Sequence, residues 1–109
     1  MIVLVNVTPD GKVGGGWGRA PRIAVAEVAD GAVTNWTEHD VGWDRLHDEG
    51  GEGSHHARIV RFVRENGAEM IVTGHMGPPM QNTLDKLGVR LVLGATGDAR
   101  TAAVAAAQA

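Results

Sequence analysis

Residues 71–94 read IVTGHMGPPMQNTLDKLGVRLVLG, and this stretch decides the fold because two strands flank a helix there with almost no intervening chain. The apolar, β-branched run 70–73 predicts the first of these strands. The pair Pro78-Pro79 then predicts the start of a helix, since proline is tolerated in the first helical turn, where its missing N–H costs nothing.

The remainder of the stretch has the pattern of a helix followed by a buried strand. Side chains recur at the spacing of one helix face at four positions, Met80, Thr83, Leu84 and Leu87. Gly88 follows them, at the position where a glycine ends a helix in the left-handed conformation. The run 89–93 predicts the second strand, and a strand, crossover helix and strand form a right-handed parallel pair. Ligands bind beyond the carboxyl ends of such strands, so His75, where the first strand ends, marks the first place to look for a site.

Three further strand-like runs precede this unit. The run 2–7 is apolar nearly throughout, which is typical of a central strand covered on both faces, and we expect it to pair with the first strand of the unit. The runs 22–29 and 32–38 are separated by Asp30-Gly31, which is a strong hairpin signal. These two runs therefore predict an antiparallel pair.

The rest of the chain adds a long loop and two helices. The segment 39–53 shows neither the period of a strand nor that of a helix and predicts a surface loop. Ser54 predicts the N-cap of the next helix. The buried stripe of that helix is formed by Ile59, Val60, Phe62 and Val63. Asp98 or Thr96 predicts the cap of a final helix over 99–108.

The length limits the chain to one domain over residues 1–109. The order of its strands and helices predicts an α/β fold with a five-stranded mixed sheet, an antiparallel hairpin and three helices. The absence of cysteine excludes disulfides and thiolate metal ligands. A net charge of -3 argues against nucleic-acid and anionic-membrane partners, which require a basic surface. The one basic cluster, Arg58, Arg61 and Arg64, is expected on a solvated helix face. No apolar run is long enough for a membrane helix or a signal peptide, so we expect a cytoplasmic protein.

Three segments are expected to meet at one edge of the sheet: the glycine-rich loop after the first strand, the start of the helix that follows the long loop, and the turn 74–79. Their amides and helix N-termini favour an anion. His55 and His56 project toward the sheet, either as metal ligands or as partners of loop carbonyls at the edge of the core. Trp43, His39 and His47 of the long loop are placed to lie over a ligand, and the alternative for Trp17 and Trp43 is that they pack on the sheet edge.

Enzymatic chemistry is poorly supported by the sequence. The glycine-rich loop departs from G-x-G-x-x-G because Arg19 stands where the last glycine would be. The first strand has no carboxylate of the kind that a two-metal nuclease requires. Ser54 is the only serine, and helix capping accounts for it. We therefore expect no enzymatic activity.

Several short motifs are spread along nearly the whole chain. They are GRAP at 18–21, GHMGP at 74–78, LGV at 87–89 and GATG at 94–97, together with His55 at the start of a helix. In these motifs the chain resembles the dinitrogenase iron-molybdenum cofactor biosynthesis domain family. The resemblance implies a three-layer α/β/α, ribonuclease H-like fold without nuclease activity. It also implies a small carrier of iron-sulfur or iron-molybdenum cofactor precursors.

The resemblance suggests residues for such a site. Gly16-Trp17-Gly18 stands where the family commonly has His-Phe-Gly, so the histidine is missing and the aromatic residue is kept in kind. The candidate metal ligands are His55, His56 and His75. The residues expected to shape the pocket are Gly15, Gly16, Trp17, Arg19, Gly74 and Gly77, with Arg19 balancing the charge of an anionic cluster. The alternatives are a module of the same fold that binds a small anion or a protein partner without metal, and an interaction domain whose histidines are structural.

Overall fold

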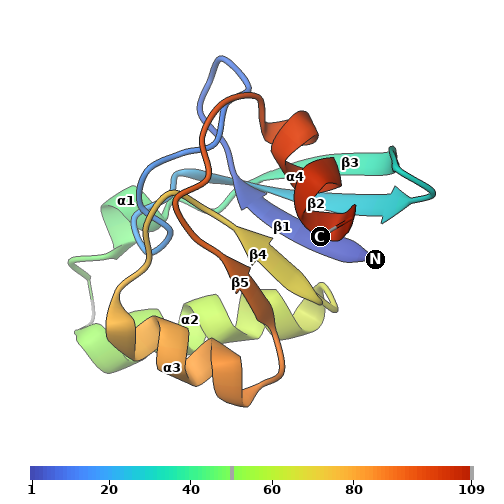
Figure 1. Ribbon diagram of the computed structural model, residues 1–109. Coiled ribbons are helices and arrows are strands. Elements are labelled where there is room, and N and C mark those ends of the chain that lie inside the picture. Colours follow the sequence, from blue (N-terminus) through green and yellow to red (C-terminus); the bar gives the residue numbers. More distant parts are fainter. Residues whose placement is uncertain (50, 109) are drawn as a thin grey trace.

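The sheet has five strands in the order β3-β2-β1-β4-β5 (Figure 1). The computed structural model describes residues 1–49 and 51–108. The strands are β1 (Ile2–Asn6), β2 (Arg22–Ala29), β3 (Ala32–Asp40), β4 (Met70–Val72) and β5 (Arg90–Val92). Strand β1 pairs with β4 in parallel and with β2 in antiparallel orientation. Both predictions for this strand are therefore confirmed: it is central in the sheet, and it pairs with the first strand of the crossover unit.

Helices cover both faces of the sheet, and within the described ranges there are four of them. They are α1 (Trp43–Leu46), α2 (Glu52–Glu65), α3 (Pro78–Lys86) and α4 (Ala99–Gln108). Helices α2 and α3 lie on one face and α4 lies on the other (Figure 1). Successive residues of β1 point to opposite faces, so Leu4 joins the core under α2 and α3 while Val3 and Val5 join the core under α4. The predicted three-layer α/β/α class is confirmed, with the short helix α1 in addition.

The crossover unit forms in the predicted order, but the predicted burial of its second strand is wrong: β5 is only partly buried, and Leu93 after it and Leu87 at the end of the helix are 41% and 45% exposed. Helix α3 begins with Pro78 after Gly77, and its last carbonyls are met by the amides of Gly88 and Val89. Gly88 has φ +79°, the left-handed conformation that glycine adopts without a steric penalty. Strand β5 then pairs in parallel with β4.

The hairpin between β2 and β3 is also confirmed. Asp30 and Gly31 have φ 52° and 76°, as a two-residue turn that matches the twist of the strands requires. Strand β3 continues to Asp40, two residues beyond the predicted end, where Asp40 is the register partner of Arg22. The Arg22 guanidinium donates to the Asp40 carboxylate at 2.8 Å, so an ion pair across the strands extends the ladder.

Two predictions about the segment that follows β3 are wrong. The segment 39–53 is not a loop throughout, because it contains the end of β3, helix α1 and the start of α2. Ser54 is not an N-cap: the cap is Gly51, and Ser54 lies inside α2. Gly51 has φ 82° and ψ 164°, a conformation open almost only to glycine, and the chain therefore enters the helix three residues earlier than the serine indicates.

The cap of α4 is Asp98, one of the two residues predicted for that role. Its Oδ2 accepts hydrogen bonds from the backbone N–H of Thr101 at 2.9 Å and from the Thr101 hydroxyl at 2.8 Å. The Thr101 amide, followed by its hydroxyl, holds the pKa of the Asp98 carboxyl below its ordinary value. The ionised carboxylate therefore stabilises the helix start, and protonation removes that contribution.

Replacing Asp98 with alanine is expected to lower the urea midpoint at pH 7 and to have a smaller effect near pH 2.5. Because the pKa is lowered in the folded state, the contribution of Asp98 is complete above the ordinary carboxyl pKa and is lost as the pH falls through the folded value. Urea unfolding of the wild type and the variant at both pH values measures the difference. Asp85→Ala removes an exposed carboxylate from α3 as the control. An equal loss for Asp98→Ala at both pH values would contradict the capping role.

Candidate functional site

Three segments that are distant in sequence meet beyond the carboxyl ends of β1 and β4, as the sequence predicts. The amide of Gly74 donates to the carbonyl of Gly14 at 3.2 Å, and the amide of Trp17 donates to the carbonyl of His75 at 2.9 Å. The turn after β4 is therefore joined by its backbone to the glycine-rich loop after β1. The start of α2 approaches the same loop through a side chain, His55.

Gly74 is required for the close approach of the two loops. A Cβ at this position would lie 2.9 Å from the carbonyl oxygen of Gly15 and 3.0 Å from that of Gly14. Both neighbours are backbone atoms, so no side-chain rotation relieves the contact. Asn6 supports the glycine-rich loop from the end of β1, since its Nδ2 donates to the carbonyl of Gly16 at 3.3 Å.

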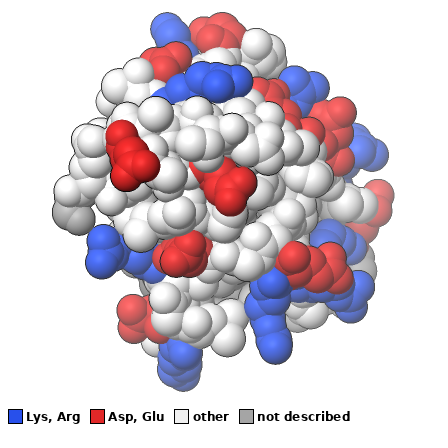
Figure 2. All heavy atoms as spheres, turned by 90° about the vertical axis from the view of Figure 1, so that its right-hand side faces the viewer, with Lys and Arg blue, Asp and Glu red and all other residues white. Residues whose placement is uncertain are grey.

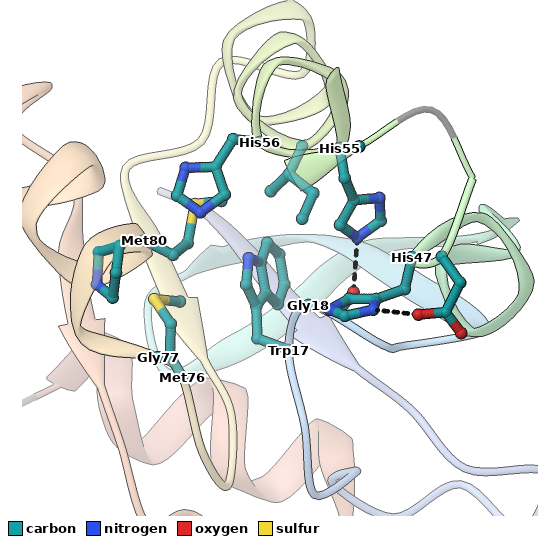
Figure 3. Close-up of a pocket in the computed structure, with 12 residues that line it drawn as sticks. Trp17, Gly18, His47, His55, His56, Met76, Gly77 and Met80 are labelled. Atoms are coloured by element: carbon teal, nitrogen blue, oxygen red, sulfur yellow. Dashed lines mark hydrogen bonds and ion pairs between the residues drawn. The ribbon is translucent and has the colours of Figure 1, made fainter. Parts of the chain in front are cut away.

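The meeting point encloses a pocket of about 450 Å³, within the range of small-molecule and cofactor sites (Figure 3). The residues that line it come from all three segments and from the chain after α1. They are Trp17, Gly18, His47, Asp48, Gly51, His55, His56, Ile59, Met76, Gly77, Pro79 and Met80. Most of this wall is apolar, and its polar groups are imidazoles, one carboxylate and one indole N–H.

Trp17 is fully buried and forms the centre of the pocket wall. Its ring packs edge-on against Trp43 with 5.2 Å between centroids, and both rings belong to the core on this face of the sheet. The Nε1–H of Trp17 has no hydrogen-bond partner among the described residues. Figure 3 shows this nitrogen on the side of the ring that faces His56, Met76 and Met80. An unpaired buried donor of this kind costs about 1–3 kcal/mol, which a ligand with an acceptor atom would remove.

His55 is buried, and both of its ring nitrogens have partners within the protein. Its Nε2 lies 2.7 Å from the carbonyl oxygen of Gly18, and its Nδ1 lies 2.9 Å from Nη1 of Arg58. Because the carbonyl can only accept and the guanidinium can only donate, Nε2 carries the proton and Nδ1 accepts. The alternative that this histidine satisfies a loop carbonyl is therefore confirmed. A metal could reach Nδ1 only by displacing Arg58.

Arg58 was expected on the solvated face of its helix, and this prediction is wrong. The side chain is half-buried, and its Nη1 also lies 3.4 Å from the carbonyl oxygen of Leu46, at the end of α1. It therefore connects α1 with α2 through His55. The spacing of three residues between His55 and Arg58 was the available signal, because residues three apart on a helix are neighbours.

The other imidazoles of the pocket differ in their surroundings. His56 is half-buried, and Figure 3 shows its ring on the same side of Trp17 as the thioethers of Met76 and Met80. His47 lies on the other side of Trp17, with its Nδ1 3.2 Å from a carboxylate oxygen of Asp48. Sequence reasoning missed Met76 as a pocket residue, although an apolar side chain between the glycines of a turn is an unusual feature.

The remaining predicted site residues lie around the pocket. Gly77 lines it directly, whereas Gly15, Gly16 and Gly74 form the backbone behind Trp17. The side chains of Arg19 and His75 are exposed and are outside the described lining. His75 contributes its carbonyl, which accepts from the Trp17 amide, while Gly16 pairs with it as an isolated bridge. Across the described residues, no group of three or more His, Cys, Asp or Glu is arranged to hold a metal ion. The ligand roles of His55, His56 and His75 stay predictions.

Comparison with known proteins bears on the whole chain. The sequence matches the family described as dinitrogenase iron-molybdenum cofactor over residues 1–109. No curated protein gives a significant match. Among solved structures, the one titled "Crystal structure of PH0822" superposes with a TM-score of 0.73 at 20% sequence identity, covering 99% of this chain and 89% of that one, which shows a common fold. Among the helices of the described residues, none has the length and apolar character needed to cross a membrane.

Proposed function

Because the chain belongs to the dinitrogenase iron-molybdenum cofactor family, we propose that it is a small non-enzymatic carrier that binds an iron-sulfur or iron-molybdenum cofactor precursor in the pocket beside Trp17. The family links the protein to the handling of this cofactor. The pocket is the place where three segments of the fold converge, and it lies beyond the carboxyl ends of parallel strands, where open α/β sheets bind ligands.

The unpaired Nε1–H of Trp17 is the observation that carries the proposal. Iron-sulfur clusters are anionic and present sulfide or other acceptor atoms at their surface, and hydrogen bonds to those atoms stabilise them. The nitrogen is itself fully buried, so an acceptor atom of the cargo would reach it only when the side chains that cover it move aside, and the bond would then form where water does not compete. The apolar wall formed by Ile59, Met76 and Met80 surrounds the cargo and limits its contact with solvent.

A synthetic [4Fe–4S] cluster capped by four thiolates tests the proposal under anaerobic conditions. We expect about four iron atoms per chain to co-elute with the protein in gel filtration. Gly77→Phe should abolish this retention, because a Cβ at Gly77 meets only the Pro79 Cδ at an ordinary 3.9 Å and the new side chain would fill the pocket. Gly15→Phe adds the same side chain outside the pocket lining, in open space, and should bind like the wild type. Failure of the wild type to retain iron, or equal retention by Gly77→Phe, would refute the carrier role.

A module that binds an anion or a partner without metal is the second candidate function. The engagement of both His55 nitrogens favours it, as does the lack of a three-ligand group within the described ranges. A rise in the midpoint of thermal unfolding with inorganic phosphate, without any rise with the capped cluster, would support this function over the carrier role.

A further inference from the structure

The charge of the pocket beside Trp17 suits an uncharged ligand better than a cluster or an inorganic anion. Counting histidine as neutral, Asp48 is the only charged side chain among the described residues that line the pocket. The guanidinium of Arg58 is directed at His55 and at the carbonyl of Leu46, outside this lining. An anion buried without a paired cation loses its hydration and gains no equal interaction in exchange.

The start of α3 also offers little to an anion. Helix N-termini bind anions through backbone N–H groups that have no partner within the helix. The first two residues of α3 are Pro78 and Pro79, which have no N–H. Since Pro79 lines the pocket, the helix start adds an apolar ring to the wall in place of donors.

The remaining wall suits an aromatic molecule. Met76 and Met80 line the pocket together with the ring of Trp17, and the two methionines are 1% and 5% exposed. Thioethers make favourable contacts with aromatic rings, and three rotatable bonds let each methionine adjust to the shape of a ligand. The volume of about 450 Å³ is within the range of pockets that hold small organic molecules.

The indole N–H of Trp17 adds one polar requirement. It is buried and has no partner among the described residues. Figure 3 shows this nitrogen on the side of the ring where Met76 and Met80 lie, so movement of their flexible side chains would give a ligand access to it. A neutral carbonyl or ether oxygen accepts from such a donor without the cost of burying a charge.

We infer that the pocket beside Trp17 is a binding site for an uncharged aromatic molecule that carries one hydrogen-bond acceptor. The inference goes beyond the carrier function and does not rest on it, because it concerns a different class of ligand. A molecule of this class occupies the space that the carrier function gives to a cluster. The two ligands therefore compete for the pocket.

A matched series of naphthalenes tests the inference by calorimetry at pH 7. Methyl 2-naphthoate has the neutral acceptor, naphthalene lacks it, and 2-naphthoate carries a charge on the same rings. The ester should bind about fivefold more tightly than naphthalene, as expected for one neutral hydrogen bond. It should bind at least about tenfold more tightly than 2-naphthoate, whose charge has no partner in the lining. Absence of ester binding, or equal binding of 2-naphthoate, would overturn the inference.

The indole N–H signals of the three tryptophans locate the contact in a nuclear magnetic resonance spectrum of the wild type. The ester should shift the Trp17 signal. The Trp36 signal should stay in place, because that N–H donates to the Glu38 carboxylate at 2.9 Å and lies outside the pocket lining. An ester that binds without moving the Trp17 signal would overturn the assignment of this site.

Variants separate the hydrogen bond from the cavity. Trp17→Phe keeps an aromatic ring without the N–H and should bind the ester and naphthalene equally, whereas Trp36→Phe should keep the wild-type preference. Gly77→Phe should bind neither molecule, because its side chain fills the pocket. Urea unfolding confirms that each variant is folded. An unchanged preference for the ester in folded Trp17→Phe would overturn the inference.

The capped cluster gives a separate result for the carrier function. Iron that the wild type retains and that saturating ester displaces would support both proposals. Retained iron without ester binding would overturn only the inference drawn from the charge of the lining. Ester binding without retained iron would refute only the carrier role.

Discussion

Replacing Trp43 with alanine is expected to lower the free energy of unfolding by about 4 kcal/mol, the loss typical of a large aromatic residue removed from a core. Trp43 is 1% exposed although it belongs to a four-residue helix. Its ring packs edge-on against Trp17 at 5.2 Å and against Phe62 at 5.6 Å between centroids. Urea unfolding followed by circular dichroism measures the loss. The variant should also lose the near-ultraviolet signal of the Trp17 and Trp43 pair.

Trp36→Ala provides the matched control for this prediction. Trp36 lies on β3 and is half-buried, and the guanidinium of Arg100 stacks over its ring at 4.6 Å from the centroid. Removal of a partly exposed ring with one cation–π contact should cost about 1 kcal/mol. A loss for Trp43→Ala no larger than that for Trp36→Ala would show that α1 is not anchored by Trp43.

Substituting Gly74 with alanine is expected to cost about 2–3 kcal/mol and to abolish ligand binding in the pocket. The added Cβ meets the carbonyl oxygens of Gly14 and Gly15 at 3.0 and 2.9 Å, so the two loops must separate, and overpacking of this kind typically costs 1–3 kcal/mol. Separation breaks the Gly74 to Gly14 hydrogen bond and moves Trp17 away from α2. Urea unfolding gives the stability change, and retention of the capped cluster reports on the pocket.

Gly15→Ala is the control for the Gly74 substitution. Gly15 lies in the glycine-rich loop that faces Gly74, and a Cβ there meets no atom within 4 Å. Its stability should stay within about 0.5 kcal/mol of the wild type, as for most surface substitutions. A Gly74→Ala variant that is as stable as Gly15→Ala and still retains the cluster would show that the two loops do not need their present spacing.

The elements that the sequence predicted correctly are those whose signals are local. Asp30-Gly31 supplies both residues of the hairpin turn, and Pro78 and Gly88 mark the two ends of α3. The N-cap of α4 likewise depends on residues three positions apart, Asp98 and Thr101. Each signal acts within a few residues of chain, so no tertiary contact is needed to recognise it.

Helix α1 was not predictable because its stabilising contacts come from distant parts of the chain. The amide of Trp43 donates to the carbonyl of Ala20, and that of Gly42 donates to the carbonyl of Pro21. Four residues are also too few for a helical period to show. The start of α2 was misplaced for a related reason: Gly51 opens the helix through a backbone conformation, and the N-cap preferences of side chains do not report it.

The position of the candidate site followed from the order of strands and turns, but its chemistry did not. Sequence reasoning brought the glycine-rich loop, the start of α2 and the turn after β4 to one edge of the sheet. It could not decide that His55 contacts a carbonyl while His56 lines the pocket, because adjacent residues on a helix differ by only 100° in direction. Nor could it show that the indole N–H of Trp17 lacks a partner, since that depends on every neighbour of the ring.

The N-terminus and the end of α4 lie at the side of the molecule away from the pocket (Figure 1). Strand β1 runs from the N-terminus toward the glycine-rich loop, and α4 returns the chain to the starting side. Figure 2 looks onto that side, where acidic and basic residues are interspersed without a large patch of either sign. A tether attached after α4 would therefore leave the opening of the pocket facing away from a resin or a second domain. A ligand could then reach the pocket while the protein stays attached.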